Sequence, residues 1–253
     1  MRNAVAAEWV KLRSIRSTWL CLAGGVVVSV LGAVALGGAA AMEQPAVQAT
    51  EPAVSVMLFS QYASITLAVL AVTTEYASGT IRPTLQAVPV RGRMLAAKSI
   101  VVAPVLFATG VLGGAVAALC AYLVLLAPVF PAPAVLDPAE AAADLLGLGV
   151  FHALIGVLAV GVSTALRGSA GALAALFMVT LGLPLLLVMT GGAVALEVSL
   201  RLPTFAGMAF LESTDNLTGG PLPYPPGEGL AWLAAWTALA LAAGHAVLRR
   251  RDA

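Results

Sequence analysis

Few side chains in this sequence are of the types that catalyse reactions, and their spacing fits none of the common catalytic motifs. His152 and His245 are the only histidines and lie far apart, whereas a metal site needs three or four clustered ligands. Ser163, in Gly161-Val-Ser-Thr, lacks the second glycine of a nucleophile elbow. No GxxxxGK(S/T) phosphate-binding loop occurs. The sequence therefore predicts a chain that is not an enzyme and that binds no metal or cofactor itself.

His152 lies about two turns into a long apolar segment, where we expect a hydrogen-bonded residue inside a helix bundle. A role in a substrate path or in proton transfer is the alternative. No Asp, Glu, Lys or Arg lies at the centre of any long apolar segment. Carriers driven by protons or sodium ions normally place such residues there, so the pattern argues against a carrier of that kind.

The segment best suited to contact a partner is the polar loop 75–98, which separates two long apolar segments. Gly79 allows a break in the chain, Thr80 is a suitable N-cap, and Pro83 is tolerated in a first helical turn. Pro89 would end the helix. One apolar face runs along it, formed by Ile81, Leu85 and Val88. The pattern predicts a short helix parallel to the membrane, and force applied to it would move both flanking spans.

The basic residues of this loop allow a second interpretation, in which the short helix only anchors the chain at the membrane surface. Three arginines would then contact lipid phosphates: Arg82, Arg91 and Arg93. Glu75, at the end of the preceding apolar segment, is also open to two interpretations. It forms a local ion pair beside these arginines, or it acts in a hinge between the span and the loop.

The composition requires a membrane as the solvent for most of the chain. Hydrophobic residues make up 60% and charged residues only 10%, against about 25% charged residues in soluble domains. A helix needs about 20 apolar residues to cross the hydrocarbon. Six segments meet this length, approximately 19–41, 54–74, 99–127, 145–166, 170–190 and 229–248. We predict an all-α integral membrane protein, a single domain over 1–253 with six transmembrane helices, the third extending a helix that begins near Arg91.

The charged residues are sorted to opposite sides of these spans. Twelve of the 13 basic residues lie before the first span, after the second, after the fourth or after the sixth, and Arg201 is the exception. Nine of the 12 acidic residues lie in the alternate segments. Basic residues are retained on the cytoplasmic side of a membrane. We therefore expect a multi-pass plasma-membrane protein with both termini in the cytoplasm, in agreement with the even number of spans.

The N-terminal segment 1–17 is expected to form an amphipathic helix in the inner membrane interface. It carries a stripe at helical spacing, formed by Val5, Trp9, Leu12 and Arg16. Three charged residues lie mostly off this stripe: Glu8, Lys11 and Arg13.

The longest outer segment, 191–228, is unusual because residues 193–211 are too apolar to stay in water. We expect one or two short helices that dip into the outer leaflet. A seventh complete span is disfavoured, because it would hold Glu197 and Arg201 in hydrocarbon.

The loop also resembles a family signature. Its motif, Glu75-x3-Gly-Thr-Ile-Arg-Pro-Thr-Leu followed by Pro89-x-Arg91-x-Arg93 and Ala97-Lys98, resembles the signature loop of type-2 (export-type) ABC-transporter permeases. The start of the chain, Glu8-Trp-x-Lys11-Leu-Arg-Ser-x-Arg-Ser-Thr-Trp19, is similar to that of many actinobacterial members. The resemblance implies that residues 79–89 are a coupling helix that docks in a cleft of a separate ATP-binding subunit, with Glu75 at its hinge and 193–211 as outer re-entrant helices. The residues implied in this contact are Glu75, Gly79, Thr80, Ile81, Arg82, Pro83, Leu85, Val88, Arg91 and Arg93.

The same resemblance implies a function. Two permease subunits, identical or different, would work in the lipid bilayer with two ATPase subunits, which alone bind ATP and magnesium; nucleic acid is not an expected partner. The expected function is outward movement of an amphipathic or hydrophobic cargo, such as a drug, antibiotic, peptide or lipid-like molecule, because the spans are apolar and uncharged. The alternatives are an ATP-independent channel or carrier, a membrane scaffold that anchors a cytoplasmic partner, and an intramembrane enzyme.

Overall fold

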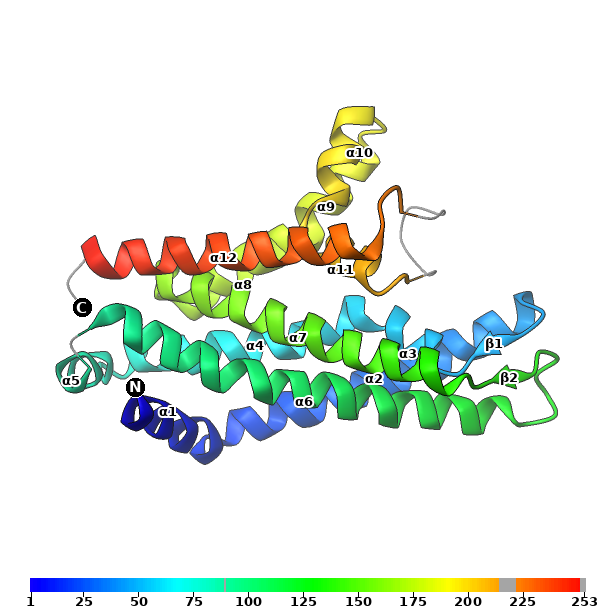
Figure 1. Ribbon diagram of the computed structural model, residues 1–253, viewed down its shortest axis with the longest axis horizontal. Helices are drawn as coiled ribbons and strands as arrows, with labels where there is room; N and C mark the ends of the chain where they lie inside the picture. Colours follow the sequence, from blue (N-terminus) through cyan, green and yellow to red (C-terminus); the bar gives the residue numbers. More distant parts are fainter. Residues whose placement is uncertain (89, 214–221, 251–253) are drawn as a thin grey trace.

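The computed structural model describes residues 1–88, 90–213 and 222–250, without the side chain of Leu85. Its helices form an elongated bundle (Figure 1). Among the described residues, six helical segments are long and apolar enough to cross a membrane, which confirms the all-α membrane fold. They are α2 (Arg16–Glu43), α4 (Met57–Ala77), α6 (Arg91–Leu125), α7 (Pro138–Leu166), the continuous run of α8 (Ser169–Phe177), η1 (Met178–Gly182) and α9 (Leu183–Met189), and α12 (Pro226–Arg250).

Shorter elements lie at the two ends of the bundle. α1 (Arg2–Ser14) is followed by one extended residue, Ile15, and then by α2. α5 (Ile81–Ala87) joins α4 to α6. Helices α1 and α5 and the end of α12 lie at one end, which we call the α5 end (Figure 1). At the opposite end, the sheet end, β1 (Val47–Gln48) pairs in parallel with β2 (Ala134–Val135). The remaining helices are α3 (Glu51–Ser55), α10 (Ala193–Leu200) and α11 (Pro203–Phe210).

Some helices extend beyond the predicted spans. The fourth span, predicted at 145–166, begins at Pro138, because Asp137 caps α7: its carboxylate accepts hydrogen bonds from two backbone N–H groups of the first turn, at 2.8 and 3.2 Å. The third span, predicted at 99–127 within a helix that begins near Arg91, is the later part of α6, which starts at Arg91 and ends at Leu125. The first turns of α7 are thus helical residues that the predicted span limits had left in a loop.

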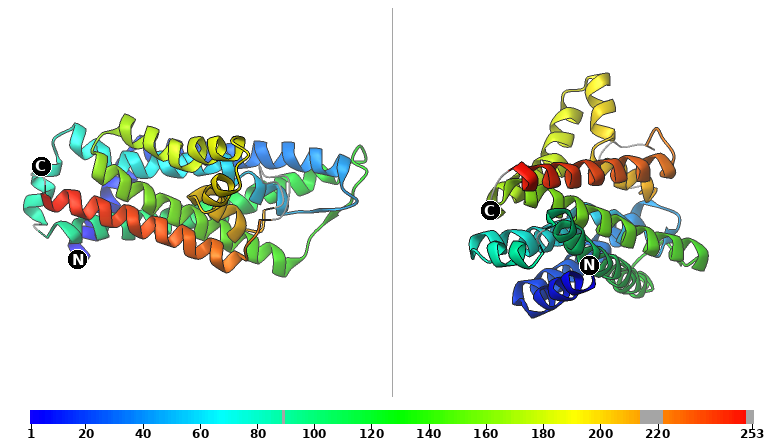
Figure 2. Two further views of the ribbon diagram at one scale, coloured as in Figure 1. Left: turned by 90° about the horizontal axis from the view of Figure 1, so that it is seen from above. Right: turned by 60° about the vertical axis from the view of Figure 1, so that its left-hand side comes forward.

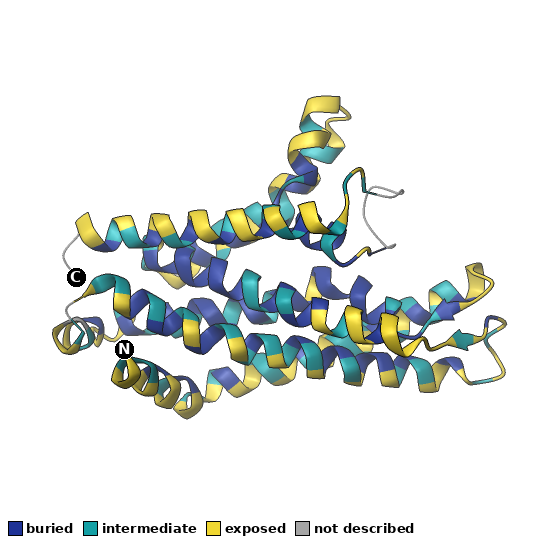
Figure 3. Ribbon diagram, in the orientation of Figure 1, coloured by how far each residue is buried: buried dark blue, intermediate teal, exposed yellow. Residues whose placement is uncertain are grey.

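Glycine allows α7 to approach two neighbouring helices backbone to backbone. A Cβ atom on Gly110 of α6 would lie 2.6 Å from the carbonyl oxygen of Leu148 in α7. Farther along α7, a Cβ atom on Gly161 would lie 2.4 Å from the carbonyl carbon of Ala240 in α12. Neither distance leaves room for a side chain, so both crossings depend on glycine. Together with α4, α7 forms the most enclosed part of the bundle, whereas α2 and α12 are largely exposed (Figure 3).

Replacing Gly161 by alanine is expected to lower the free energy of unfolding by about 1–3 kcal/mol, the usual effect of overpacking. The added methyl group would meet backbone atoms of α12, which cannot rotate away. Gly24→Ala in α2 is the matched control, because no atom lies within 4 Å of that Cβ position. Unfolding of the purified protein in detergent measures both, and equal stability of the two variants would contradict the argument.

The fifth span is not a regular α-helix. Its middle, η1, is a π-helical turn that ends at Gly182, two residues before Pro184, which has no N–H group for the helical hydrogen bonds. After this span, α10 and α11 meet at 69°, as in a broken span or a re-entrant loop, and α10 projects from the bundle (Figures 1 and 2). Residues 214–221 of the predicted outer segment 191–228 lie outside the described residues. The short helices expected at 193–211 are present as α10 and α11, and their insertion into the outer leaflet stays a prediction.

Candidate functional site

The short helix predicted in the loop 75–98 is present as α5 (Figure 1). Gly79 precedes it with a φ of 71°, a left-handed conformation that glycine adopts without strain. Ile81 is only 5% exposed and packs in the hydrophobic core, and Val88 packs against the same core. Arg82 and Pro83 are exposed. One side of α5 is thus fixed to the bundle, and the other side faces away from it.

The cap of α5 differs from the prediction. Thr80 holds the N-cap position, but its side chain makes no capping hydrogen bond to the helix. Its hydroxyl lies instead 2.9 Å from the hydroxyl of Ser78. The side chain of Leu85, predicted on the apolar face, and Pro89, predicted to end the helix, lie outside the described residues.

The loop arginines are not the partners of Glu75, in contrast to the ion pair considered from the sequence. Arg91 begins α6, and its guanidinium donates a hydrogen bond to the backbone carbonyl of Leu248 in α12. Arg82 and Arg93 have exposed side chains. Glu75 instead contacts two lysines, Lys11 and Lys98.

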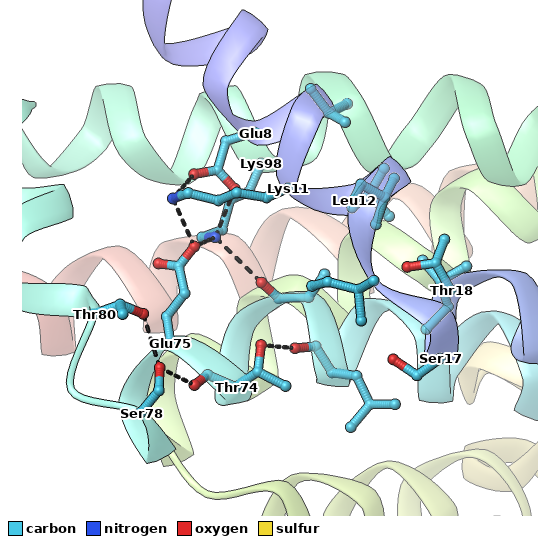
Figure 4. Close-up of a pocket in the computed structure, with 16 residues that line it drawn as sticks. Glu8, Lys11, Leu12, Ser17, Thr18, Thr74, Glu75, Ser78, Thr80 and Lys98 are labelled. Atoms are coloured by element: carbon cyan, nitrogen blue, oxygen red, sulfur yellow. Dashed lines mark hydrogen bonds and ion pairs between the residues drawn. The ribbon is translucent and has the colours of Figure 1, made fainter.

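Four charged residues from three helices meet in what we call the ion cluster: Glu8 and Lys11 of α1, Glu75 of α4 and Lys98 of α6 (Figure 4). The Lys98 ammonium lies 2.7 Å from Oε2 of Glu8 and 2.7 Å from Oε1 of Glu75. The Lys11 ammonium lies 2.9 Å from Oε1 of each of the same two residues. The four charges sum to zero. The cluster therefore joins α1, α4 and α6 by ion pairs at the α5 end of the bundle.

Because most of the ion cluster is buried, its charged groups need hydrogen-bond partners within the protein. Lys98 is 2% exposed, Glu75 6% and Glu8 8%. Lys98 donates a third hydrogen bond to the backbone carbonyl of Ala71, at 3.2 Å, and Lys11 donates one to the hydroxyl of Thr84 in α5, at 3.3 Å. Each ammonium thus has three acceptors for its three N–H groups. Within the described part of the chain, Oε2 of Glu75 is buried and has no hydrogen-bond partner.

Lys11 is the most exposed member of the cluster, and it connects the cluster to α5. Partial burial acts to lower its pKa, but hydrogen bonds and charge from Glu8 and Glu75 outweigh burial and raise the pKa above the ordinary 10.5. Because the pKa is raised in the folded state, the stabilisation is complete below pH 10.5 and is lost only as the pH rises through the raised value. The Lys11 ammonium, which donates the hydrogen bond to Thr84, is therefore charged at neutral pH.

Sequence reasoning did not select Glu8, Lys11 or Lys98 as site residues. The predicted stripe of α1 included Trp9 and left Glu8 off it, as part of a helix in the membrane interface; in the structure Trp9 is 47% exposed, whereas Glu8 is buried. The available signal was Lys98, which follows four apolar residues, 94–97, and precedes a long apolar run. An ammonium at such a position requires a carboxylate partner.

His152 is buried between α7 and α4. Its Nδ1 lies 2.9 Å from the hydroxyl of Ser64, and its Nε2 lies 3.4 Å from the hydroxyl of Ser60. These contacts agree with its interpretation as a hydrogen-bonded residue inside the bundle. Among the residues that the structure describes, no group of three His, Cys, Asp or Glu residues is placed to hold a metal ion.

Comparison with known proteins gave a family match. A family model described as "ABC-2 family transporter protein" matches residues 4–182, more than half of the chain. The matched region includes α5 and all four residues of the ion cluster. A search of the curated proteins gave no match.

Proposed function

This chain belongs to the ABC-2 transporter family and is a membrane permease component of an ABC transporter, and from this premise we propose that it exports an amphipathic cargo with energy from ATP. Two copies of a separate subunit bind the ATP and magnesium in this proposal. A second permease copy, identical or different, completes the complex in the plasma membrane. Both chain termini lie in the cytoplasm.

The observation that carries the proposal is the attachment of α5. This helix is held between two long spans, α4 and α6, and it presents Arg82 and Pro83 outward. A helix with one packed side and one exposed side suits docking in a groove of a partner. We propose that the exposed side of α5 docks on the ATP-binding subunit, with Gly79 as the flexible point on the α4 side.

The ion cluster supports a route for the resulting movement. Closure of the ATP-binding subunits would displace α5, and the hydrogen bond from Lys11 to Thr84 would transmit this displacement to α1. The bonds of Lys98 to Glu8 and Glu75 would carry α6 and α4 along with it. Because these charges are buried, separating them is unfavourable, so the four helices would move as one unit.

The nature of the spans supports an amphipathic or hydrophobic cargo. Most large exposed side chains of α2 and α9 are apolar, including Leu20, Leu31 and Leu186 at 72%, 66% and 57% exposure. Such surfaces are compatible with lipid tails and with a second permease subunit. They offer no counter-charges to a small hydrophilic ion, whose transfer into hydrocarbon is strongly unfavourable.

Site-directed crosslinking tests the docking of α5. Gln86, an exposed residue of α5, is replaced by cysteine in a chain whose Cys21 and Cys120 are replaced by alanine, and the chain is co-expressed with candidate ATP-binding subunits. We expect a specific crosslink to one such subunit and ATP-dependent outward flux of amphiphiles after reconstitution. Leu136→Cys, exposed at the sheet end, is the matched control and should give no such crosslink.

Each other outcome favours a different function. A crosslink without ATP-dependent flux would favour a membrane scaffold. Flux from the chain alone would favour a channel or carrier. Transport of small hydrophilic ions without any response to amphiphiles would contradict the proposed cargo class.

A further inference from the structure

An open groove of approximately 540 Å³ lies on the outside of the bundle, where α1, α2 and α6 meet. These three helices are side by side along one edge of the molecule (Figure 1). The groove is lined by Trp9 of α1, by residues of α2 between 19 and 26, and by residues of α6 between 104 and 116. At 1.5 Å per helical residue, the wall from α6 is about 18 Å long, slightly more than half of a hydrocarbon layer of ~30 Å. The groove therefore has the length of one membrane leaflet.

The lining of the groove presents hydrocarbon to an occupant. The hydroxyl of Thr109 already donates a hydrogen bond to the backbone carbonyl of Val105, at 2.8 Å. The indole N–H of Trp19 donates one to the backbone carbonyl of Arg13, at 3.0 Å. The remaining lining residues are apolar or aromatic. An acyl chain suits such a surface, whereas a polar molecule would lose its own hydrogen bonds there.

Polar recognition is available at the end of the groove nearest to α5, where two arginines continue its walls. Arg13 follows Trp9 by four residues on α1, and Arg16 precedes Trp19 by three residues at the start of α2. Each arginine therefore lies on the same helix face as the tryptophan. Both arginines are exposed, and neither has a carboxylate partner within the part of the chain that the structure describes. Guanidinium groups pair with phosphate through two parallel hydrogen bonds, so a phosphate group suits this end.

We propose that the groove binds one anionic phospholipid, whose phosphate pairs with Arg13 and Arg16 and whose acyl chain lies between α2 and α6. A zwitterionic lipid carries a cation next to its phosphate, which would be repelled by the two arginines, so the net negative charge selects the lipid. The bound lipid fastens α1 to the two neighbouring spans. The inference goes beyond the proposed function, because this lipid stays in place and is not the exported cargo.

A second permease copy fits the groove less well than a lipid does. Identical chains that pair by two-fold symmetry use the same surface on both sides of the interface. Arg13 and Arg16 of one copy would then lie close to the same two residues of the other copy, and like charges would face each other. The two tryptophans of the lining, Trp9 and Trp19, are 47% and 57% exposed, as is typical of tryptophan at the level of lipid head groups.

Photolabelling of the full-length protein in phosphatidylcholine nanodiscs tests the site. Trace amounts of two probes, phosphatidylglycerol and phosphatidylcholine with the same diazirine-bearing acyl chain, are compared. We expect phosphatidylglycerol to label peptides containing residues 19–26 and 104–116 roughly 25-fold more, from about fivefold for each arginine beside an anionic lipid. Equal labelling by the two probes would overturn the proposal, because it would indicate ordinary contact with the surrounding bilayer only.

Two double variants separate this site from a general attraction of anionic lipid to basic residues. The variant with Arg13→Gln and Arg16→Gln should be labelled equally by the two probes. The matched control carries Arg249→Gln and Arg250→Gln, which remove two exposed charges at the α5 end of α12, and should be labelled like the natural chain. An equal loss of selectivity in both double variants would assign the effect to surface charge in general and overturn the site.

Two further variants test whether the acyl chain lies in the groove. Ala108→Phe places a ring in the groove and should lower labelling by phosphatidylglycerol to the level of phosphatidylcholine, whereas Ala238→Phe, on an exposed face of α12, should not. Undiminished labelling of Ala108→Phe would overturn the proposal. So would a crosslink between two copies of the chain through Leu112→Cys, with Cys21 and Cys120 replaced by alanine, because it would assign the groove to a second permease. Labelling needs neither ATP nor the partner subunit, so its failure would leave the proposed export standing.

Discussion

Replacing Lys98 by methionine lowers the free energy of unfolding by about 3–5 kcal/mol, the expected effect of removing one partner from a buried ion pair. The methionine fills nearly the same space, so the effect comes from charge and not from a cavity. Glu8 and Glu75 would lose their shared ammonium and would depend on Lys11 alone. Unfolding of the purified chain in mild detergent, followed by circular dichroism against a denaturing detergent, measures this loss.

A charge-balanced double variant provides the control for Lys98→Met. Adding Glu8→Gln removes one acid together with the base and leaves Lys11 paired with Glu75, so we expect more than half of the lost stability to return. Arg13→Met, which removes an exposed base from the same short helix α1, should change stability by less than about 0.5 kcal/mol. A Lys98→Met chain that unfolds like the natural chain would show that the ion cluster does not hold the three helices together.

Replacing Glu75 by glutamine is expected to reduce ATP-dependent export by about 5- to 150-fold, the range that corresponds to coupling free energies of 1–3 kcal/mol. Glutamine has the size of glutamate but lacks its charge, so the charge-assisted hydrogen bonds from Lys11 and Lys98 are weakened. Displacement of α5 would then no longer carry α1 and α6 with it. Assembly with the ATP-binding subunit should persist, because the exposed side of α5 is unchanged. The measurement is export and ATP hydrolysis by the same reconstituted complex.

Glu197→Gln is the matched control, because Glu197 forms an ion pair with Arg201 outside the α5 end. Its export and ATP hydrolysis should equal those of the natural chain. Natural export by Glu75→Gln would reduce the ion cluster to a purely structural role. A parallel loss of ATP hydrolysis and of subunit assembly would place the defect in docking rather than in transmission.

The parts of the molecule that depend on local sequence could be predicted. The α5 helix follows from a glycine break at Gly79, a proline at position 83 and apolar spacing over a few residues. The spans follow from runs of apolar residues that need no information about their neighbours. Both are confirmed as elements, although caps such as Asp137 extend them beyond the hydrophobic limits.

The ion cluster could not be predicted in the same way, because its partners are distant in the sequence. Lys98 is separated from Glu8 by 90 residues and from Glu75 by 23. The helical stripe of α1 left Glu8 off the apolar side, but the buried ammonium of Lys98 requires carboxylates, and Glu8 is the residue that reaches it. The rotation of α1 therefore depends on charge neutralisation at Glu8 as well as on Leu12, which packs in the hydrophobic core.

The parallel pair of β1 and β2 has a mechanical consequence. These strands fasten the chain after α2 to the chain before α7, and the side-chain amide of Gln48 adds a hydrogen bond to Glu140 at 2.6 Å. When helices are held together at one end, a rotation about that end displaces their opposite ends, the tips, the most. Over a hydrocarbon thickness of ~30 Å, a tilt of roughly 10° about this tie displaces the opposite tips by about 5 Å, close to one helical turn. α5 and the ion cluster lie at these tips. A small rotation of the helices about the sheet end therefore corresponds to a large displacement at the α5 end.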